Sequence, residues 1–305
     1  MYCDRIVRAL AKCTGVLILI LASSAGVAAP RYVISAPGNT PEWNKKLGVT
    51  ELWVGCSSEP ERCMKTLDYY ARHDGVNQVT LSISEDAKLV AGYALSYSQA
   101  SLAEPRLRAI VLDDFVSAEL RWQNEGVAVG PLVQQVISNV KAKNPKLVFG
   151  LTVYEDQLRF PVLQDSVLPA AVRAQVDRVS LFVHFRQNGP QYASYVAETK
   201  RIFPKAIIIA GVYPYDRTAY LPCAPGTKEH CSHAQEMDLF QTTLRVEVGM
   251  VDSGQVAGIQ FWPGNFGSEQ AWSGWDSPGA CEPSQHQECV NTTVAMHNAV
   301  EKALH

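Results

Sequence analysis

The sequence predicts a single (β/α)8 barrel, in which eight parallel strands close into a sheet surrounded by helices. Two observations support this prediction: apolar runs of strand length recur eight times, and segments with helical spacing lie between them. An open, doubly wound sheet is the alternative. Such a sheet usually carries a glycine-rich phosphate loop after its first strand, and residues 35–38 are followed by no G-x-G-x-x-G pattern.

Each predicted strand is an apolar run followed by a loop or a helix-like segment. The predicted strands occupy residues 32–36, 51–55, 78–83, 109–113, 147–154, 178–185, 206–213 and 256–262. The predicted helices occupy residues 61–73, 86–103, 131–143, 190–203, 234–251 and 292–304. The pattern is clearest at 131–143, whose apolar residues at 133, 136, 137 and 140 share one helical face. It is least regular at 86–103.

Alternation along the strands predicts which side chains point into the barrel. One parity of each strand is small or polar toward its carboxyl end, and the other parity is large and apolar, as expected for packing against helices. The inward set is Thr80, Ser82, Ser84, Asp113, Gly150, Thr152, Tyr154, Ser180, Phe182, His184, Arg186, Gly211, Tyr213, Tyr215, Gly258, Gln260 and Trp262. Its polar members gather at the carboxyl ends, where barrel enzymes keep their active sites.

The N-terminal segment has the three parts of an export signal. Basic residues lie within the first 12 positions, residues 15–22 form a short apolar run, and small residues precede Pro30. The apolar run is shorter than the roughly 20 residues that a membrane helix needs. We therefore expect a signal peptide at 1–29 and a barrel domain at 30–305; a retained N-terminal anchor is the alternative.

Composition and charge narrow the class of protein. The chain is 47% hydrophobic and 19% charged, which is typical of a globular protein. Its formal net charge of -3 argues against a nucleic-acid-binding protein, which usually carries a basic face. We expect a secreted or periplasmic monomer that binds no nucleic acid, needs no cofactor and has no stable membrane span after signal removal.

The cysteines agree with export. Cys3 and Cys13 lie in the predicted signal, so six of the eight remain. Short local spacing favours sequential pairing, and an oxidising compartment favours disulfides over zinc. A zinc site formed by Cys231 with His230 and His233 is the alternative. The predicted pairs are Cys56 with Cys63, Cys223 with Cys231, and Cys281 with Cys289.

Asp113 and Asp114 end the fourth predicted strand and are the strongest catalytic candidates. Two adjacent carboxylates at the mouth of a barrel repel each other, so their pKa values should separate. Separated pKa values are what an acid and a base need to work at one pH. The alternative is that one aspartate caps the following turn and only the other reaches the site.

Two further carboxylates follow strands five and seven. Glu155 is a candidate catalytic partner of Asp113, and Asp216 is a candidate substrate-binding residue or partner. The alternative for each is an ion pair within a loop, with Arg159 or Arg217 as the cation.

His184 and Arg186 face inward on the sixth predicted strand, and Gln260 faces inward on the eighth. We expect all three to bind substrate, with His184 available for acid–base work or for a hydrogen bond to a hydroxyl. Arg186 is suited to an anion or to orienting Asp113. A buried network that braces the barrel mouth is the alternative.

Aromatic residues gather at the predicted strand ends. Such rings bury the apolar faces of sugars while their phenol and indole groups stay polar. Trp272 and Trp275 lie in the loop after the eighth strand. This clustering favours a carbohydrate cleft. The aromatic substrate-binding candidates are Trp53, Tyr154, Tyr213, Tyr215 and Trp262.

No G-x-S-x-G elbow, P-loop or H-E-x-x-H motif is present in the sequence. An exported barrel with acidic residues ending strand four and a tryptophan ending strand eight resembles the glycoside hydrolases. Within that group, the residues LDDF at 112–115 resemble the paired-aspartate motif of the substrate-assisted N-acetylglucosaminidases. The resemblance implies that Asp113 orients the substrate's N-acetyl group and that Asp114 is the general acid. It also implies that Tyr213 or Tyr215 binds the N-acetyl oxygen and that Trp262 floors the sugar pocket.

The sequence therefore predicts a secreted glycoside hydrolase that cleaves a poly- or oligosaccharide by carboxylate acid–base catalysis. Other barrel glycosidases take their carboxylates from two strands, which here pairs Asp113 with Glu155 or Asp216. Two alternatives remain open. The first is a barrel that binds glycans without cleaving them. The second is a metal-dependent hydrolase that uses Asp113, His184 and Asp216.

Overall fold

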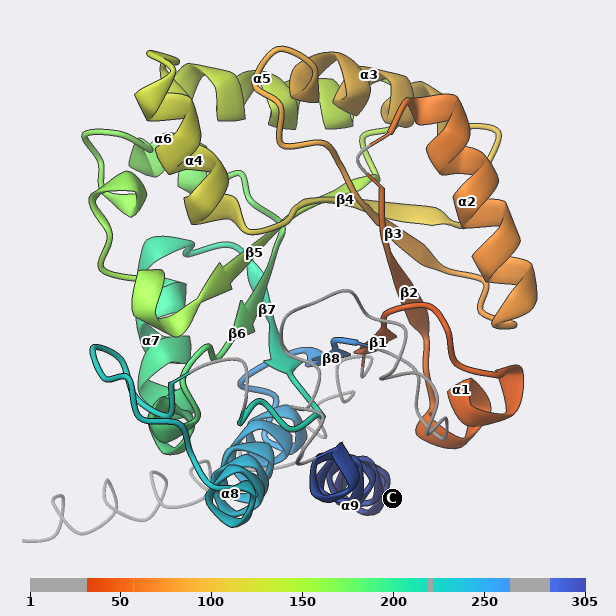
Figure 1. Cartoon of the computed structure of the whole chain (residues 1–305). Helices are drawn as coiled ribbons and strands as arrows, with labels where there is room; N and C mark the ends of the chain where they lie inside the picture. Colours follow the sequence, from red (N-terminus) through yellow and green to blue (C-terminus); the bar gives the residue numbers. More distant parts are fainter. Residues whose placement is uncertain (1–31, 57, 219–221, 264–285) are drawn as a thin grey trace, which may run out of the picture. The chain divides into compact units, whose positions relative to one another are not determined.

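The computed structural model describes residues 32–56, 58–218, 222–263 and 286–305. Eight parallel strands pair in sequence order, and the last pairs with the first, so the sheet is a closed barrel with helices around it (Figure 1). The predicted (β/α)8 barrel is confirmed. The predicted signal peptide, Trp272, Trp275 and Cys281 lie outside the described residues.

Every predicted strand is present, with small differences at the ends. The strands are β1 (Tyr32–Ser35), β2 (Glu51–Gly55), β3 (Val79–Ser82), β4 (Leu107–Leu112), β5 (Val148–Tyr154), β6 (Arg178–Phe182), β7 (Ile207–Val212) and β8 (Gly258–Phe261). The largest difference is at β6, which ends three residues before the predicted boundary. It ends early because the backbone N–H groups of His184 and Phe185 bind the Glu155 carboxylate.

The helices include several that apolar periodicity did not predict. The helices are α1 (Pro41–Leu47), α2 (Pro60–His73), α3 (Val90–Ala100), α4 (Phe115–Asn124), α5 (Val129–Lys141), α6 (Ala170–Arg173), α7 (Tyr192–Ile202), α8 (His233–Asp252) and α9 (His286–Leu304). Three short 3-10 helices, η1 (Glu155–Gln157), η2 (Pro161–Leu163) and η3 (Arg186–Gln191), lie in the crossovers after β5 and β6. The sequence did not predict α1, α4 or α6, which are short; α4 matters most because it begins directly after Asp114.

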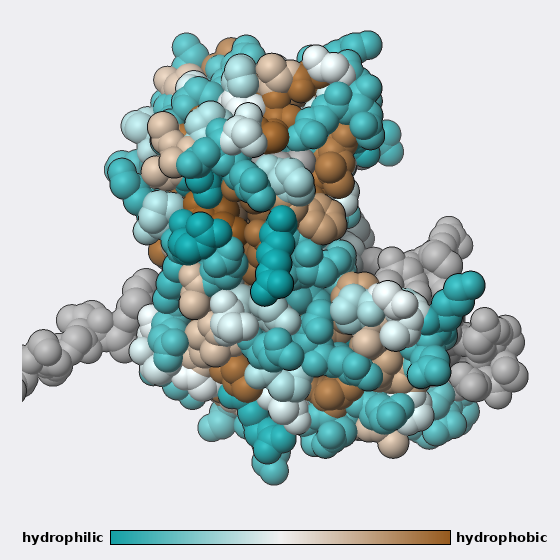
Figure 2. Space-filling model, turned by 90° about the vertical axis from the view of Figure 1, so that its left-hand side faces the viewer, coloured by the Kyte–Doolittle hydropathy of each residue, from teal (hydrophilic) through white to brown (hydrophobic). Residues whose placement is uncertain are grey.

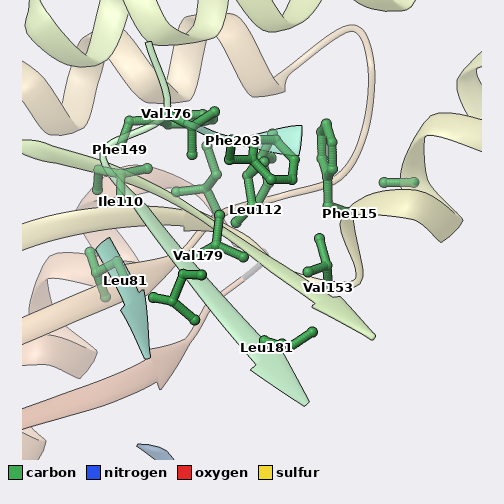
Figure 3. Close-up of a cluster of buried hydrophobic side chains, with 14 of the residues drawn as sticks. Leu81, Ile110, Leu112, Phe115, Phe149, Val153, Val176, Val179, Leu181 and Phe203 are labelled. Carbon is green, nitrogen blue, oxygen red and sulfur yellow. The ribbon is translucent and has the colours of Figure 1, made fainter. Parts of the chain in front are cut away.

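The outward parity of the strands packs against the helices. Figure 3 shows this layer, in which side chains of several strands meet residues from neighbouring helices and loops. Each of these side chains is almost fully buried, so the layer contributes most of the hydrophobic stabilisation at about 25 cal/mol per Å². The labelled residues are Leu81, Ile110, Leu112, Phe115, Phe149, Val153, Val176, Val179, Leu181 and Phe203.

The barrel interior contains polar groups that are paired with each other. Arg178 Nη1 donates to Glu51 Oε1 at 2.8 Å, and Arg178 Nη2 donates to Thr80 Oγ1 at 2.5 Å. Ser180 Oγ donates to Gln260 Oε1 at 2.7 Å. These contacts join side chains of strands two, three, six and eight across the interior. Gln260, a predicted substrate-binding residue, is therefore engaged inside the barrel and is 3% exposed.

Two of the predicted disulfides are present. Cys56–Cys63 ties the end of β2 to α2, and Cys223–Cys231 closes part of the crossover between β7 and α8. Cys289 also forms a disulfide. Because Cys231 is oxidised, the alternative zinc site is not formed.

Hydrophilic side chains cover most of the face shown in Figure 2, and apolar side chains gather there in small patches. Within the described parts of the chain, every helix is too short or too polar to span a bilayer.

Candidate active site

A cleft of about 730 Å³ opens at the carboxyl ends of β2, β3, β4 and β8. This is within the roughly 300–1,000 Å³ that small-molecule sites occupy. Trp53 and Trp262 line it, with ring centroids 4.9 Å apart in an edge-to-face arrangement. Asp113 lines the same cleft. The structure thus brings three of the predicted site residues to one cavity.

Asp113 follows the last residue of β4, which places its carboxyl group at the barrel mouth. Burial and the nearby charge of Asp114 raise the pKa of Asp113 to about 7. The hydroxyl of Thr152 and the backbone N–H of Asp114 act in the opposite direction. A carboxyl group with this pKa holds a proton through the mildly acidic range and releases it near neutrality.

Asp114 precedes α4 and has a left-handed backbone, with φ 44° and ψ 42°. Aspartate tolerates this region better than most residues. The turn ends the alternation of β4, so two consecutive carboxylates lie close together although neighbouring strand residues face opposite ways. Tyr154 Oη donates to Asp114 Oδ1 at 2.6 Å.

Tyr154, which is buried, and Tyr213, which is partly exposed, stand behind the aspartate pair. Tyr213 Oη donates to Tyr154 Oη at 3.3 Å. Burial, followed by the neighbouring tyrosine, raises the pKa of each phenol well above its ordinary value. Both therefore stay neutral and keep the protons that they donate. Tyr215 packs edge-to-face against Tyr213 at 5.9 Å.

Glu155 is 4% exposed, and its carboxylate is bound to the loop after β6. It accepts hydrogen bonds from His184 N at 2.7 Å, Phe185 N at 3.1 Å and Asn188 Nδ2 at 2.9 Å. His184 Nδ1 donates to Asp156 Oδ1 at 3.0 Å. Atoms of Glu155, Asp156 and His184 lie within 4.8 Å of one another, a spacing that a metal ion requires. The loop already uses both oxygens of Glu155, and Asp156 already accepts from His184, so a metal ion would have to displace these hydrogen bonds.

Arg186 and Asp216 are buried and connect the loop after β7 with α8. Arg186 Nε donates to Glu236 Oε2 at 2.7 Å, and its Nη2 donates to the carbonyl oxygens of Tyr213 and Tyr215, each at 2.8 Å. Asp216 is 2% exposed and pairs with His233 Nδ1. Arg186 thus has the buried-network arrangement that the sequence left open as its alternative, whereas Asp216 pairs with His233 rather than with Arg159 or Arg217.

Five charged residues of the cleft were missed from the sequence. They come from the loop after β3, from α4 and from the residue that follows α4, and Arg121 Nη2 lies 2.6 Å from Glu85 Oε2. The polar residues directly after strand three were an available signal, whereas the residues of α4 were not, because that helix was not predicted. The missed residues are Glu85, Asp86, Lys88, Arg121 and Glu125.

Comparison with known proteins relates the barrel to other structures. No family model matches the chain, and no curated protein matches it. Among solved structures, a GH113 β-1,4-mannanase is similar, with a TM-score of 0.52 and 10% identity over 89% of this chain and 99% of the mannanase. A complex of a GH113 β-1,4-mannanase gives 0.52 and 11%, over 88% and 98% of the two chains.

A β-glucuronidase of Bacteroides uniformis is also similar, with a TM-score of 0.50 and 10% identity. That similarity covers 77% of this chain and 30% of the glucuronidase, so it concerns one part of a much longer protein. At these identities the comparisons show that the chain shares the barrel fold of these enzymes.

Proposed function

We propose that this chain is an exported glycoside hydrolase that cleaves a poly- or oligosaccharide in the cleft, with Asp113 as the general acid. One observation carries the proposal: a carboxyl group with a pKa of about 7 lines a cleft that also contains two tryptophans. The solved structures with the same fold include enzymes named for glycan cleavage, which supports this choice of reaction.

The roles proposed here for Asp113 and Asp114 differ from those that the resemblance to the N-acetylglucosaminidases implies. Asp113 lines the cleft and is protonated in the mildly acidic range, so it donates a proton to the glycosidic oxygen as the bond breaks. Water then adds its oxygen to the anomeric carbon and returns a proton to Asp113, which completes the hydrolysis. The Asp114 carboxylate does not line the cleft; held by Tyr154 next to Asp113, it supplies negative charge that stabilises the positive charge developing on the sugar. Asp113 is therefore the acid, and Asp114 is the electrostatic partner.

The aromatic residues supply binding without charge. Trp262 is partly exposed and Trp53 is 4% exposed, and their edge-to-face contact makes a fixed apolar wall. A sugar ring can place its apolar face on such a wall while its hydroxyls meet the charged side. Glu155 and Asp216 are not needed as catalytic groups in this proposal, because their carboxylates are engaged with the loops around them.

The test is reducing-end release from a panel of bacterial and plant polysaccharides by the purified chain. We expect wild type to cleave at least one substrate and Asp113→Asn to lose about 10²–10⁴-fold in rate. Glu119→Gln is the matched control: Glu119 is a fully buried carboxyl group on α4 with a pKa raised to about 9, and it does not line the cleft. This control should retain the wild-type rate.

Other outcomes favour other functions. Full activity in Asp113→Asn would refute its role as the acid. Inactivity on the whole panel, together with retention on a glycan affinity gel, would favour a glycan-binding barrel. Loss of activity in a chelator, restored by a divalent ion, would favour a metal-dependent hydrolase.

A further inference from the structure

Resting on the proposed function, we infer that Tyr154 is a positioning residue, which holds the Asp114 carboxylate beside Asp113. We further infer that Glu155 acts at a distance, because it fixes the loop whose His184 ring covers Tyr154. The sequence assigned Tyr154 to substrate binding and Glu155 to catalysis. The contacts of the two residues support a different role for each.

The first contact sets the position of Asp114. The Tyr154 hydroxyl donates to Asp114 Oδ1 at 2.6 Å, a short bond of the kind that charged acceptors form. The same hydroxyl accepts from Tyr213 Oη at 3.3 Å, so its own proton is committed to Asp114. Tyr154 is 8% exposed and cannot turn toward solvent without leaving its pocket.

The second contact sets the position of Tyr154. The His184 ring stacks on the Tyr154 ring, with centroids 3.6 Å apart and planes 15° apart. His184 is itself held at two atoms, since Nδ1 donates to Asp156 Oδ1 at 3.0 Å and the backbone N–H donates to Glu155 Oε2 at 2.7 Å. The His184 ring is therefore held in place over one face of the Tyr154 ring.

The third contact explains Glu155. This buried carboxylate directly follows Tyr154 in the chain and gathers three donors of the loop after β6, from residues 184, 185 and 188. Without it, these donors would be left without their partner and the loop would lose its anchor. Glu155 thus affects the aspartate pair indirectly. It fixes the His184 backbone, the His184 ring packs on Tyr154, and Tyr154 binds Asp114.

The arrangement has an electrostatic consequence. Asp113 is faced by the charges of Asp114 and Glu85, and the Asp114 charge is the larger contributor to its raised pKa after burial. If Tyr154 no longer holds Asp114, the carboxylate can turn away, and the pKa of Asp113 should fall. The other ionisable side chains around Asp113 remain in place in such a variant. They are Glu85, Asp86, Lys88, Arg121, Glu125 and Tyr213.

The experiment compares Tyr154→Phe with wild type in steady-state kinetics across pH. We expect kcat to fall about 10- to 100-fold, the effect of losing one hydrogen bond to a charged group, with KM changed less than about twofold. The alkaline limb of the kcat profile should move to lower pH. Tyr97→Phe is the matched control, since Tyr97 is fully buried on α3 and its hydroxyl has no hydrogen-bond partner among the described residues.

The contribution of the loop is tested by His184→Ala, His184→Phe and Glu155→Gln. We expect His184→Ala to share the kinetic signature of Tyr154→Phe in weaker form, and His184→Phe to restore most of kcat because it keeps an aromatic ring. Glu155→Gln should behave like His184→Ala. A raised KM with unchanged kcat in Tyr154→Phe would overturn the inference and return Tyr154 to substrate binding.

A measurement without substrate separates this inference from the proposed function. Carboxyl ¹³C NMR titration of aspartate-labelled protein follows Asp113 directly, with Asp113→Asn to assign its signal. We expect the pKa of Asp113 to be lower in Tyr154→Phe than in wild type and in Tyr97→Phe. An unchanged titration would overturn the inference even if the enzyme cleaves glycans; a lowered pKa would support it even if no glycan is cleaved.

Discussion

The interior of the barrel and its mouth treat buried carboxyl groups in opposite ways. In the interior, Glu51 lies 2.8 Å from Arg178 and also accepts from Thr80, and both charged side chains are at most 5% exposed. At the mouth, Asp113 and Asp114 lie side by side, and the partner of Asp114 is a neutral phenol. The interior compensates charge, whereas the mouth leaves two acids together, and burial with the charge of Asp114 raises the pKa of Asp113 to about 7.

Burial by itself does not identify a functional carboxyl group. Burial raises the pKa of Glu119 to about 9, more than that of Asp113, yet Glu119 does not line the cleft. A perturbed pKa indicates a functional group only when the group also reaches a cavity that can admit a ligand. Asp113 meets both conditions.

The largest expected effect is on the interior pair. Arg178→Met leaves Glu51 buried without its cation, and breaking a buried ion pair typically costs about 3–5 kcal/mol. We expect the free energy of unfolding to fall by this amount in urea titrations. The alkaline limb of the activity profile should stay in place, because Arg178 does not line the cleft. An unchanged stability would show that the interior does not depend on this compensation.

Asp113, at the mouth of the barrel, should make the free energy of unfolding depend on pH. Below about pH 4 Asp113 is protonated in both states; above that, the unfolded carboxyl ionises near 3.8 while the folded one keeps its proton up to about 7. The free energy of unfolding therefore falls as the pH rises from 4 to 7. A difference of about 3 between the two pKa values corresponds to on the order of 4 kcal/mol.

The measurement is chemical denaturation of wild type and Asp113→Asn at pH 4, 5.5 and 7. The stability difference between the two proteins should shift in favour of the variant as the pH rises. Parallel curves at all three values would mean that Asp113 titrates in the folded protein as it does in the unfolded chain.

Glu119 is a buried carboxyl group that has no compensating cation among the described residues and does not line the cleft. Neither of its oxygens has a hydrogen-bond partner among the described residues, and its side chain is fully buried. Glu119→Leu removes a buried unsatisfied group at little change in size, so we expect about 1–3 kcal/mol of added stability at pH 7 by thermal or urea unfolding. A loss of stability would reveal a partner such as a buried water.

The smallest effect concerns the backbone at the mouth. Asp114 has φ 44°, where alanine is disfavoured by about 1–2 kcal/mol and where asparagine and glycine are tolerated. We expect Asp114→Ala to be less stable than Asp114→Asn and Asp114→Gly by about this amount in urea denaturation. Equal stability of the three variants would indicate that the turn relaxes without its left-handed residue.

Much of the fold was predictable because the barrel depends on local patterns. Apolar runs identified all eight strands, and their alternation placed Thr80, Ser180 and Gln260 inside the barrel, where the structure has them. The missed helix α4 has a physical cause: it is short, and it begins at a left-handed aspartate rather than at a side-chain cap. Its absence from the prediction also hid Arg121 and Glu125.

Local patterns were enough to predict the eight strands, the local disulfides at Cys56–Cys63 and Cys223–Cys231, and the position of Asp113 at the end of β4, because each depends on residues close together in the chain. The contacts of the other polar residues at the strand ends depend on how distant segments fold together. Tyr154, Glu155, Arg186 and Asp216 all follow or end strands, yet their partners come from different crossovers. Contacts between segments distant in sequence leave no periodic signal. The sequence therefore could not show which of these residues line the cleft and which bind the loops around it.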